Sequence, residues 1–162
     1  MTAPLDRLNR LPAGAAEAEL LDCCRSRRWA AEVAAGRPYP TPDTLHAAAD
    51  AAWWRLDAAD WDEAFAAHPR IGERDRAGAA ARREQAGVAG APAATLAALA
   101  DGNRRYEARF GRVFLVCATG RSAGDLLAEL ERRLGNDPET ELRVAAGEQA
   151  AITRLRLERL LR

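Results

Sequence analysis

The sequence predicts an all-α protein, a single compact multi-helix domain over residues 1–162. Stretches rich in alanine, with apolar residues at helical spacing, recur along the whole chain. Capping residues, prolines and glycines separate these stretches at the positions where helices begin and end. One continuous apolar run, RVFLVCATG at 112–120, has no second strand-like run to pair with, so we interpret it as an extended core segment.

The first half of the chain contains helix signals in close succession. Residues 8–40 suggest one or two short helices ending at Gly36. Thr41 and Pro42 are typical of an N-cap and a first helical position. The next helix should bury one face, formed by Leu45, Ala49, Ala52, Trp53 and Leu56. Asp57 then caps a helix that Pro69 terminates at His68.

The second half continues the pattern. Residues 76–87 favour a helix ending at Gly87, and 92–111 favour another with a weak point at Gly102 and a stop at Gly111. Ser-x-x-Asp at 122–125 predicts a capping box for a helix that closes on Gly135. Asp137 and Pro138 begin the final helix.

Composition excludes several classes of function. The formal net charge is zero, which gives no global field for nucleic acid, and no apolar run approaches the length of a membrane span. All 24 basic residues are arginines, so a Schiff base with lysine cannot form. Two distant histidines and three cysteines without a CxxC pair argue against a metal site. The odd cysteine number favours a reducing compartment, and we expect a cytoplasmic protein.

Four tryptophans and one of the histidines have structural interpretations. The tryptophans are expected in the core or between helices, but Trp53 and Trp54 cannot share one helix face. One of this pair is therefore predicted to line a cleft or interface. His46 lies beside the apolar stripe of its helix and is predicted to be structural or exposed.

Two residues are candidates for chemistry. His68 precedes Pro69 in AFAAHPRIGE, so its imidazole should project from a helix end into a turn, where helix carbonyls favour the protonated, acid-donating form. The alternative is a histidine that only caps its own helix. Glu84 with Gln85 in REQAGV could orient a histidine and bind a polar substrate, or could be an ordinary surface pair among arginines.

The combined pattern resembles the OHCU decarboxylases of urate catabolism, enzymes that act on 2-oxo-4-hydroxy-4-carboxy-5-ureidoimidazoline (OHCU). The resemblance rests on HPRIG, then EQAGV, then N-x-x-Y-x-x-RFG-x-x-F-x-x-C-x-x-G-R-S, then a terminal ITRLRLERLL, and it runs from about Leu5 onwards. It implies an all-helical, cofactor-independent carboxy-lyase, commonly a homodimer, that forms one enantiomer of allantoin.

The resemblance also implies site residues. The catalytic pair is His68 and Glu84. Substrate contacts are expected from the following residues: Pro69, Ala81, Arg82, Arg83, Gln85, Val116, Cys117, Ala118, Thr119, Gly120 and Arg156. Family members often carry serine where this chain has Ala81, so a hydroxyl contact is missing or supplied elsewhere. From its position alone, Cys117 favours a packing role. The competing hypothesis is a helical binding module that keeps the fold without activity.

Overall fold

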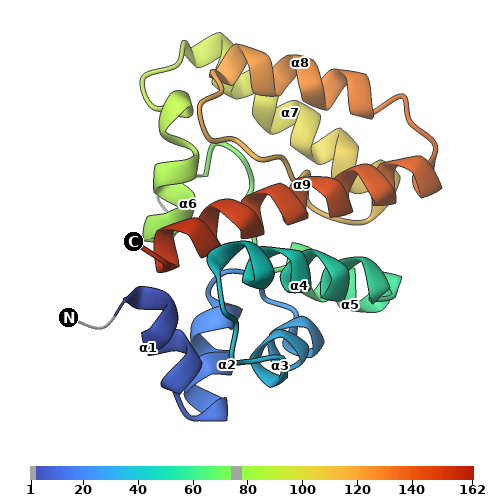
Figure 1. The fold of residues 1–162 in the computed structure, drawn as a ribbon. Helices are drawn as coiled ribbons and strands as arrows, with labels where there is room; N and C mark the ends of the chain where they lie inside the picture. The colour runs from blue at the N-terminus through green and yellow to red at the C-terminus, as the bar shows by residue number, and fades with distance from the viewer. Residues whose placement is uncertain (1–2, 74–77) are drawn as a thin grey trace. The chain divides into compact units, whose positions relative to one another are not determined.

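The computed structural model describes residues 3–73 and 78–162 (Figure 1). Within these ranges the regular structure is helical, and no β-strand occurs. The elements are α1 (Pro4–Arg10), α2 (Ala13–Leu21), α3 (Arg27–Ala35), α4 (Pro42–Arg55), α5 (Ala58–Phe65), α6 (Ala79–Glu84), the 3-10 helix η2 (Ala86–Val88), α7 (Ala93–Phe110), α8 (Ala123–Arg133) and α9 (Pro138–Leu160). The predicted fold class is confirmed.

Packing divides the chain into two units. One consists of Met1–Ala64 with Gln149–Arg162, and the other of Phe65–Glu148. Helix α9 begins in the second unit and ends in the first. His68, Glu84 and the segment 116–120 all belong to the second unit, whereas Arg156 belongs to the first.

Residues 8–40 contain α2 and α3, in agreement with the expected one or two helices, whereas α1 begins before this range, at Pro4, and was not predicted. Leu11 is extended, with φ −61° and ψ 144°, because the proline that follows disfavours helical geometry. The second break lies at Ser26, whose hydroxyl accepts a hydrogen bond from the Trp29 amide at 3.3 Å and starts α3. The predicted end at Gly36 is confirmed.

Helix α4 follows its sequence signals. Thr41 and Thr44 form a capping box, and the predicted apolar face from Leu45 to Leu56 is buried. His46 was expected to be structural or exposed; at 7% exposure it is buried, which agrees with the structural alternative. Burial is the main cause that lowers the pKa of His46, and Arg154 lowers it further.

The paired tryptophans separate as the helix geometry requires. Trp53 is 2% exposed, while Trp54 is 47% exposed and stacks edge-on against Trp61 with 5.7 Å between ring centroids. The Trp29 and Trp61 indoles donate hydrogen bonds to backbone carbonyls at 3.0 Å, which satisfies their only polar group on burial. Three of the four tryptophans are therefore core residues.

The second unit is built around α7 and α8, which pack side by side (Figure 1). Helix α7 runs unbroken through Gly102, so the predicted weak point is wrong, and a buried Leu130 side chain occupies the space that a larger residue there would need. The predicted stop at Gly111 and the Ser122–Asp125 capping box are confirmed. Of the predicted helix over 76–87, residues 76 and 77 lie outside the described residues, and the rest ends at Glu84, before Gly87.

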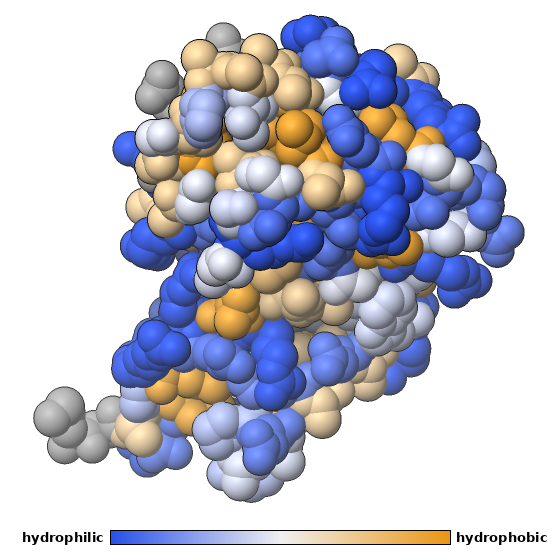
Figure 2. Space-filling view, turned by 90° about the horizontal axis from the view of Figure 1, so that it is seen from above, coloured by the Kyte–Doolittle hydropathy of each residue, from blue (hydrophilic) through white to orange (hydrophobic). Residues whose placement is uncertain are grey.

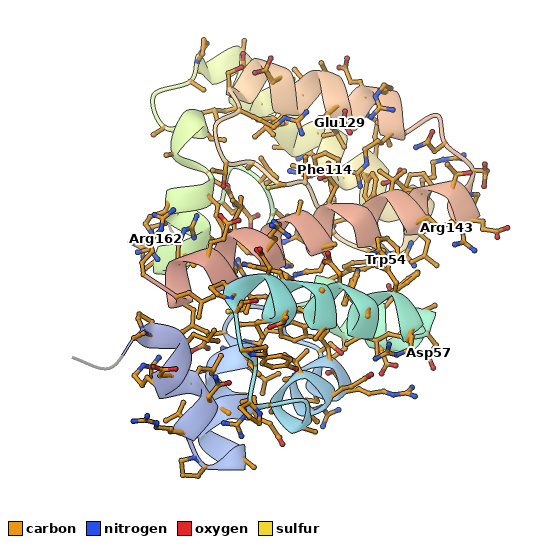
Figure 3. The ribbon with its side chains drawn as sticks, in the orientation of Figure 1. Trp54, Asp57, Phe114, Glu129, Arg143 and Arg162 are labelled. Atoms are coloured by element: carbon orange, nitrogen blue, oxygen red, sulfur yellow. The ribbon has the colours of Figure 1, made fainter. Side chains whose placement is uncertain are left out.

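A buried polar cluster supports the segment 112–121, which connects α7 to α8. Arg133 is fully buried; it donates to the Leu115 carbonyl at 2.7 Å and to the Glu141 carboxylate at 2.5 Å. The Tyr106 hydroxyl donates to the same carboxylate at 2.5 Å, and burial raises the pKa of Tyr106. Phe114, labelled in Figure 3, lies in this segment and is 1% exposed. The Arg133 guanidinium stacks over its ring, with 4.6 Å between Cζ and the ring centroid. The predicted extended core segment is confirmed.

The surface mixes hydrophilic residues with smaller hydrophobic patches, as Figure 2 shows for one face. Such mixing is the ordinary composition of a protein surface. Among residues 3–73 and 78–162, no helix is both long and apolar enough to cross a lipid bilayer.

Candidate active site

His68 lies in a turn that follows helix α5. The helix ends at Phe65, earlier than the predicted end at His68, and proline chemistry explains the difference. The Phe65 carbonyl would normally accept the amide of residue 69, but Pro69 has no N–H. The His68 amide bonds that carbonyl instead, at 3.1 Å, and the chain leaves the helix axis. The imidazole of His68 is half-buried.

The residues after Pro69 form a tight turn with contacts to two other segments. Gly72 has φ +96°, a left-handed conformation that side chains rarely adopt. Its amide donates to the Gln85 side-chain oxygen at 3.1 Å, and Asn103 on α7 donates to the Ile71 carbonyl at 3.0 Å. The HPRIG turn is thus tied to EQAGV by one hydrogen bond and to α7 by another.

Helix α6 presents Glu84 and Gln85 from its buried face. Glu84, the last helical residue, is 7% exposed, and Gln85 is 4% exposed. Ala81 shares this face at 8% exposure. Arg82 and Arg83 point to the exposed side, so the structure separates these two predicted substrate contacts from the Glu84 face.

The charge of Glu84 acts on the segment 116–120. Burial raises the pKa of the Cys117 thiol, and the negative charges of Glu148 and Glu84 raise it further. A raised thiol pKa gives little nucleophilic thiolate, in line with a packing role for Cys117. Val116 and Ala118 are buried, whereas Thr119 and Gly120 are exposed.

EQAGV and Arg121, the residue that follows the segment 116–120, touch through their backbones. A Cβ placed on Gly87 would lie 2.0 Å from the Arg121 carbonyl oxygen, closer than any side chain tolerates. Glycine is therefore required here by close approach rather than by the predicted helix end.

One hydrophobic cluster unites the motifs. Ile71 from HPRIG, Val88 from EQAGV, and Val116 and Ala118 from the apolar run all belong to it, together with buried residues of α7 and α8. Segments far apart in the sequence are therefore held together in the unit Phe65–Glu148. The polar groups next to these four residues form the candidate active site.

Arg156 has surroundings of its own in the first unit. It is half-buried on α9, and its positive charge lowers the pKa of the Cys23 and Cys24 thiols against the larger raising effect of burial. The contact of Arg156 with the substrate or with Glu84 stays a prediction.

Asn103 and Glu148 were missed as candidates by sequence reasoning. Asn103 appears in the N-x-x-Y pattern, and its buried side-chain oxygen has no hydrogen-bond partner among the described residues. It also lines a cavity of about 350 Å³ between the turn 70–73 and α7. Glu148 carries no local sequence signal, because an acidic residue in an arginine-rich helix is usually solvated. In the described part of the chain, no cluster of three or more His, Cys, Asp or Glu side chains could hold a metal ion.

Comparison with known protein families gives a consistent result. A sequence profile described as OHCU decarboxylase matches residues 9–158. The 2-oxo-4-hydroxy-4-carboxy-5-ureidoimidazoline decarboxylase of Amia calva is 31% identical over 138 residues, which cover 82% of this chain and 79% of that protein. The uric acid degradation bifunctional protein of Arabidopsis thaliana is 34% identical over 145 residues, or 85% of this chain, but this chain spans only 45% of the plant protein.

Solved structures show the same similarity. A crystal structure of OHCU decarboxylase in the presence of (S)-allantoin has a TM-score of 0.78 and 34% sequence identity, covering 88% of this chain and 96% of that chain. A crystal structure of (S)-allantoin synthase has a TM-score of 0.74 over 97% of this chain and 54% of that chain; at 21% identity it supports the fold alone.

Proposed function

Since the chain belongs to the OHCU decarboxylase family, we propose that it converts OHCU to (S)-allantoin and CO₂ in urate degradation. The observation that carries this proposal is the shared hydrophobic cluster. It gathers Ile71, Val88, Val116 and Ala118, and so brings the three motif segments into one unit. A binding module would not require this convergence of a histidine turn, a buried carboxylate and an irregular core segment.

The substrate contains its own electron sink. When the carboxylate leaves C4 as CO₂, its bonding electron pair forms a C4=C5 double bond, and the ring C5=N electrons move to nitrogen, which takes up a proton. The resulting enol loses the hydroxyl proton at C4 and gains a proton at C5, which gives allantoin. The net reaction consumes one proton, and the face that receives it at C5 decides the enantiomer. The protein must hold the anion and direct that proton.

His68 is the proposed proton donor. The backbone leaves the helix axis at His68, and we expect the carbonyls at the end of α5 to favour the protonated ring. Glu84 would orient the imidazole and bind the substrate hydroxyl or ureido group. A buried carboxylate suits this task because it is a strong acceptor in a region of low dielectric constant.

The remaining contacts are proposed for the groups around this pair. Backbone N–H groups within 116–120 and the Gln85 carboxamide would hold the ring and ureido oxygens. Pro69 and Ala81 would shape the pocket, and Arg156 would pair with the substrate carboxylate or with Glu84. The Gln85 oxygen already accepts the Gly72 amide, so its NH₂ group is the part that would face the substrate.

The larger-scale assignments are also proposals. The family profile runs across both units, which supports one functional domain over the whole chain. Unbridged cysteines at 23, 24 and 117 favour a reducing compartment, and we place the protein in the cytoplasm. We expect the homodimer implied by the resemblance; light scattering that gives the mass of one 17.5 kDa chain would contradict it.

The activity can be tested with fresh OHCU, made from urate by urate oxidase and hydroxyisourate hydrolase, and followed by circular dichroism. We expect optically active allantoin to form faster than by spontaneous decay, and chelator-treated protein to keep its activity. Racemic allantoin at the spontaneous rate would contradict the proposal and favour the helical binding module.

A further inference from the structure

The segment 112–121 must satisfy its backbone polar groups without a neighbouring strand. Buried N–H and C=O groups that lack a partner cost free energy, so each needs an acceptor or donor from elsewhere. Arg133 supplies the donor for the Leu115 carbonyl. The acceptor for the Cys117 amide is the carboxylate of Glu148 on α9.

Glu148 is well placed for this contact. Glu141, Ala145 and Glu148 lie at i, i+4 and i+7 on α9, so they share one face, and the first two are fully buried. The Glu148 side chain is 21% exposed, and its carboxylate lies 3.9 Å from the Arg121 guanidinium. The same face thus supports the segment at Leu115, through Glu141 and Arg133, and at Cys117, through Glu148.

Charges of both signs surround the Glu148 carboxylate. Burial is the main cause that raises its pKa, while Arg133 and Arg121 lower it and Glu129 raises it. Glu129, on α8 (labelled in Figure 3), also lies 3.9 Å from Arg121. Arg121 is therefore held between two carboxylates. It is the last residue of the segment 112–121, and its own carbonyl approaches Gly87.

We propose that Glu148 is a positioning residue of the active site, which fixes the substrate-binding segment 116–120 beside Glu84 through the Cys117 amide and Arg121. This inference rests on the proposed function. The charges of Glu148 and Glu84 both act on the Cys117 thiol, and the Arg121 carbonyl lies against Gly87, three residues after Glu84. A shift of the segment by about 1 Å would misplace its N–H groups relative to the substrate, and misplacement of that size can cost about 10²-fold in rate.

Two substitutions separate the contact from the charge. Glu148→Gln keeps a carbonyl oxygen that can accept the Cys117 amide, whereas Glu148→Ala removes the acceptor. Glu139→Ala is the matched control, since Glu139 lies on the same helix with its side chain 84% exposed. We would measure kcat and KM with OHCU for each folded variant, and the hydrogen exchange rate of the Cys117 amide by NMR.

We expect Glu148→Ala to lower kcat/KM about 10-fold or more, and to speed exchange at Cys117 by a similar factor while exchange in α7 and α8 stays unchanged. Glu148→Gln should retain at least about a third of the kcat/KM, and Glu139→Ala should match the unmodified chain. Unchanged exchange at Cys117 in Glu148→Ala would overturn the proposed contact. Faster exchange with unchanged kcat/KM would overturn the positioning role.

If Glu148→Ala does not fold, Glu148→Asp replaces it, because it withdraws the carboxylate by one methylene and carries the same expectations. The exchange measurement needs no substrate. An unmodified chain that fails to convert OHCU would therefore refute the proposed function, and the Cys117 exchange rates would still decide whether Glu148 holds the segment.

Discussion

Gly87→Ala tests how closely the EQAGV backbone and the segment 116–121 must approach. The added Cβ would lie 2.0 Å from the Arg121 oxygen, whereas ordinary contact begins at 3.4 Å, so the two backbones must part by about 1.4 Å. Neither partner is a flexible side-chain end, and the strain cannot be relieved by a rotamer change. Overpacking of this kind costs about 1–3 kcal/mol.

The substitution should affect both stability and activity. A loss of about 1–3 kcal/mol lowers the melting temperature of a chain this size by about 2–12 °C. The displacement also moves Glu84 and Gln85 away from residues 116–120, so kcat/KM should fall at least about 10-fold in the folded fraction.

Gly14→Ala is the control for this experiment. Gly14 lies within α2 with open space around it, so alanine should be neutral or stabilise by up to about 1 kcal/mol. Thermal melts followed by circular dichroism and kinetics with OHCU are the two assays. If Gly87→Ala melts with Gly14→Ala and keeps the kcat/KM of the unmodified chain, the inferred close approach is wrong.

Three further predictions concern the catalytic pair, the buried ion pair and the buried thiols. His68→Asn and Glu84→Gln should each lower turnover about 10²-fold or more and combine less than additively in the double variant, because each works through the other; unchanged kinetics in His68→Asn, with only a lower melting temperature, would identify a helix cap instead. Arg133→Met removes one partner of a fully buried pair and should cost about 3–5 kcal/mol in urea denaturation; a loss below about 1 kcal/mol would mean that the pair behaves as an exposed one. Burial raises the pKa of Cys23 to about 12 and of Cys24 to about 11 from 9.0, so the folded state retains protons that the unfolded state has released. The contribution of the two thiols to the free energy of unfolding should therefore be complete below pH 9.0 and be lost as pH rises towards those values, by up to about 1.4 kcal/mol per pH unit for each thiol. The loss with pH should be less steep in the double variant Cys23→Ala/Cys24→Ala. Equal slopes in the two proteins would show that these thiols are not linked to folding.

Local signals in the sequence predicted most helix boundaries because caps and glycine stops act over a few residues. The Thr41 N-cap, the Ser122 capping box and the Gly111 stop all lie where expected. The end of α5 was misplaced because the effect of Pro69 reaches back to the Phe65 carbonyl, which loses its usual donor.

Tertiary contacts explain what local signals could not predict. Gly87 was taken for a helix stop, but the carbonyl that requires it belongs to Arg121, and this contact has no signature in the local sequence. Gly102 was predicted to weaken its helix, but it packs against the Leu130 side chain, and this contact also has no signature in the local sequence. Glu148 and Arg133 were unremarkable members of charged helices until burial and backbone partners distinguished them. The catalytic pair rested on motif resemblance, and its roles remain predictions.

The most direct test of the site is an NMR titration of the isotope-labelled protein with (S)-allantoin. If the three motif segments form the active site, the largest chemical-shift changes should occur at His68, Glu84, Gln85 and residues 116–120. Residues 1–64 serve as the internal comparison, since they belong to the other unit and contain none of the three motif segments. Shift changes confined to residues 1–64 would contradict the assignment.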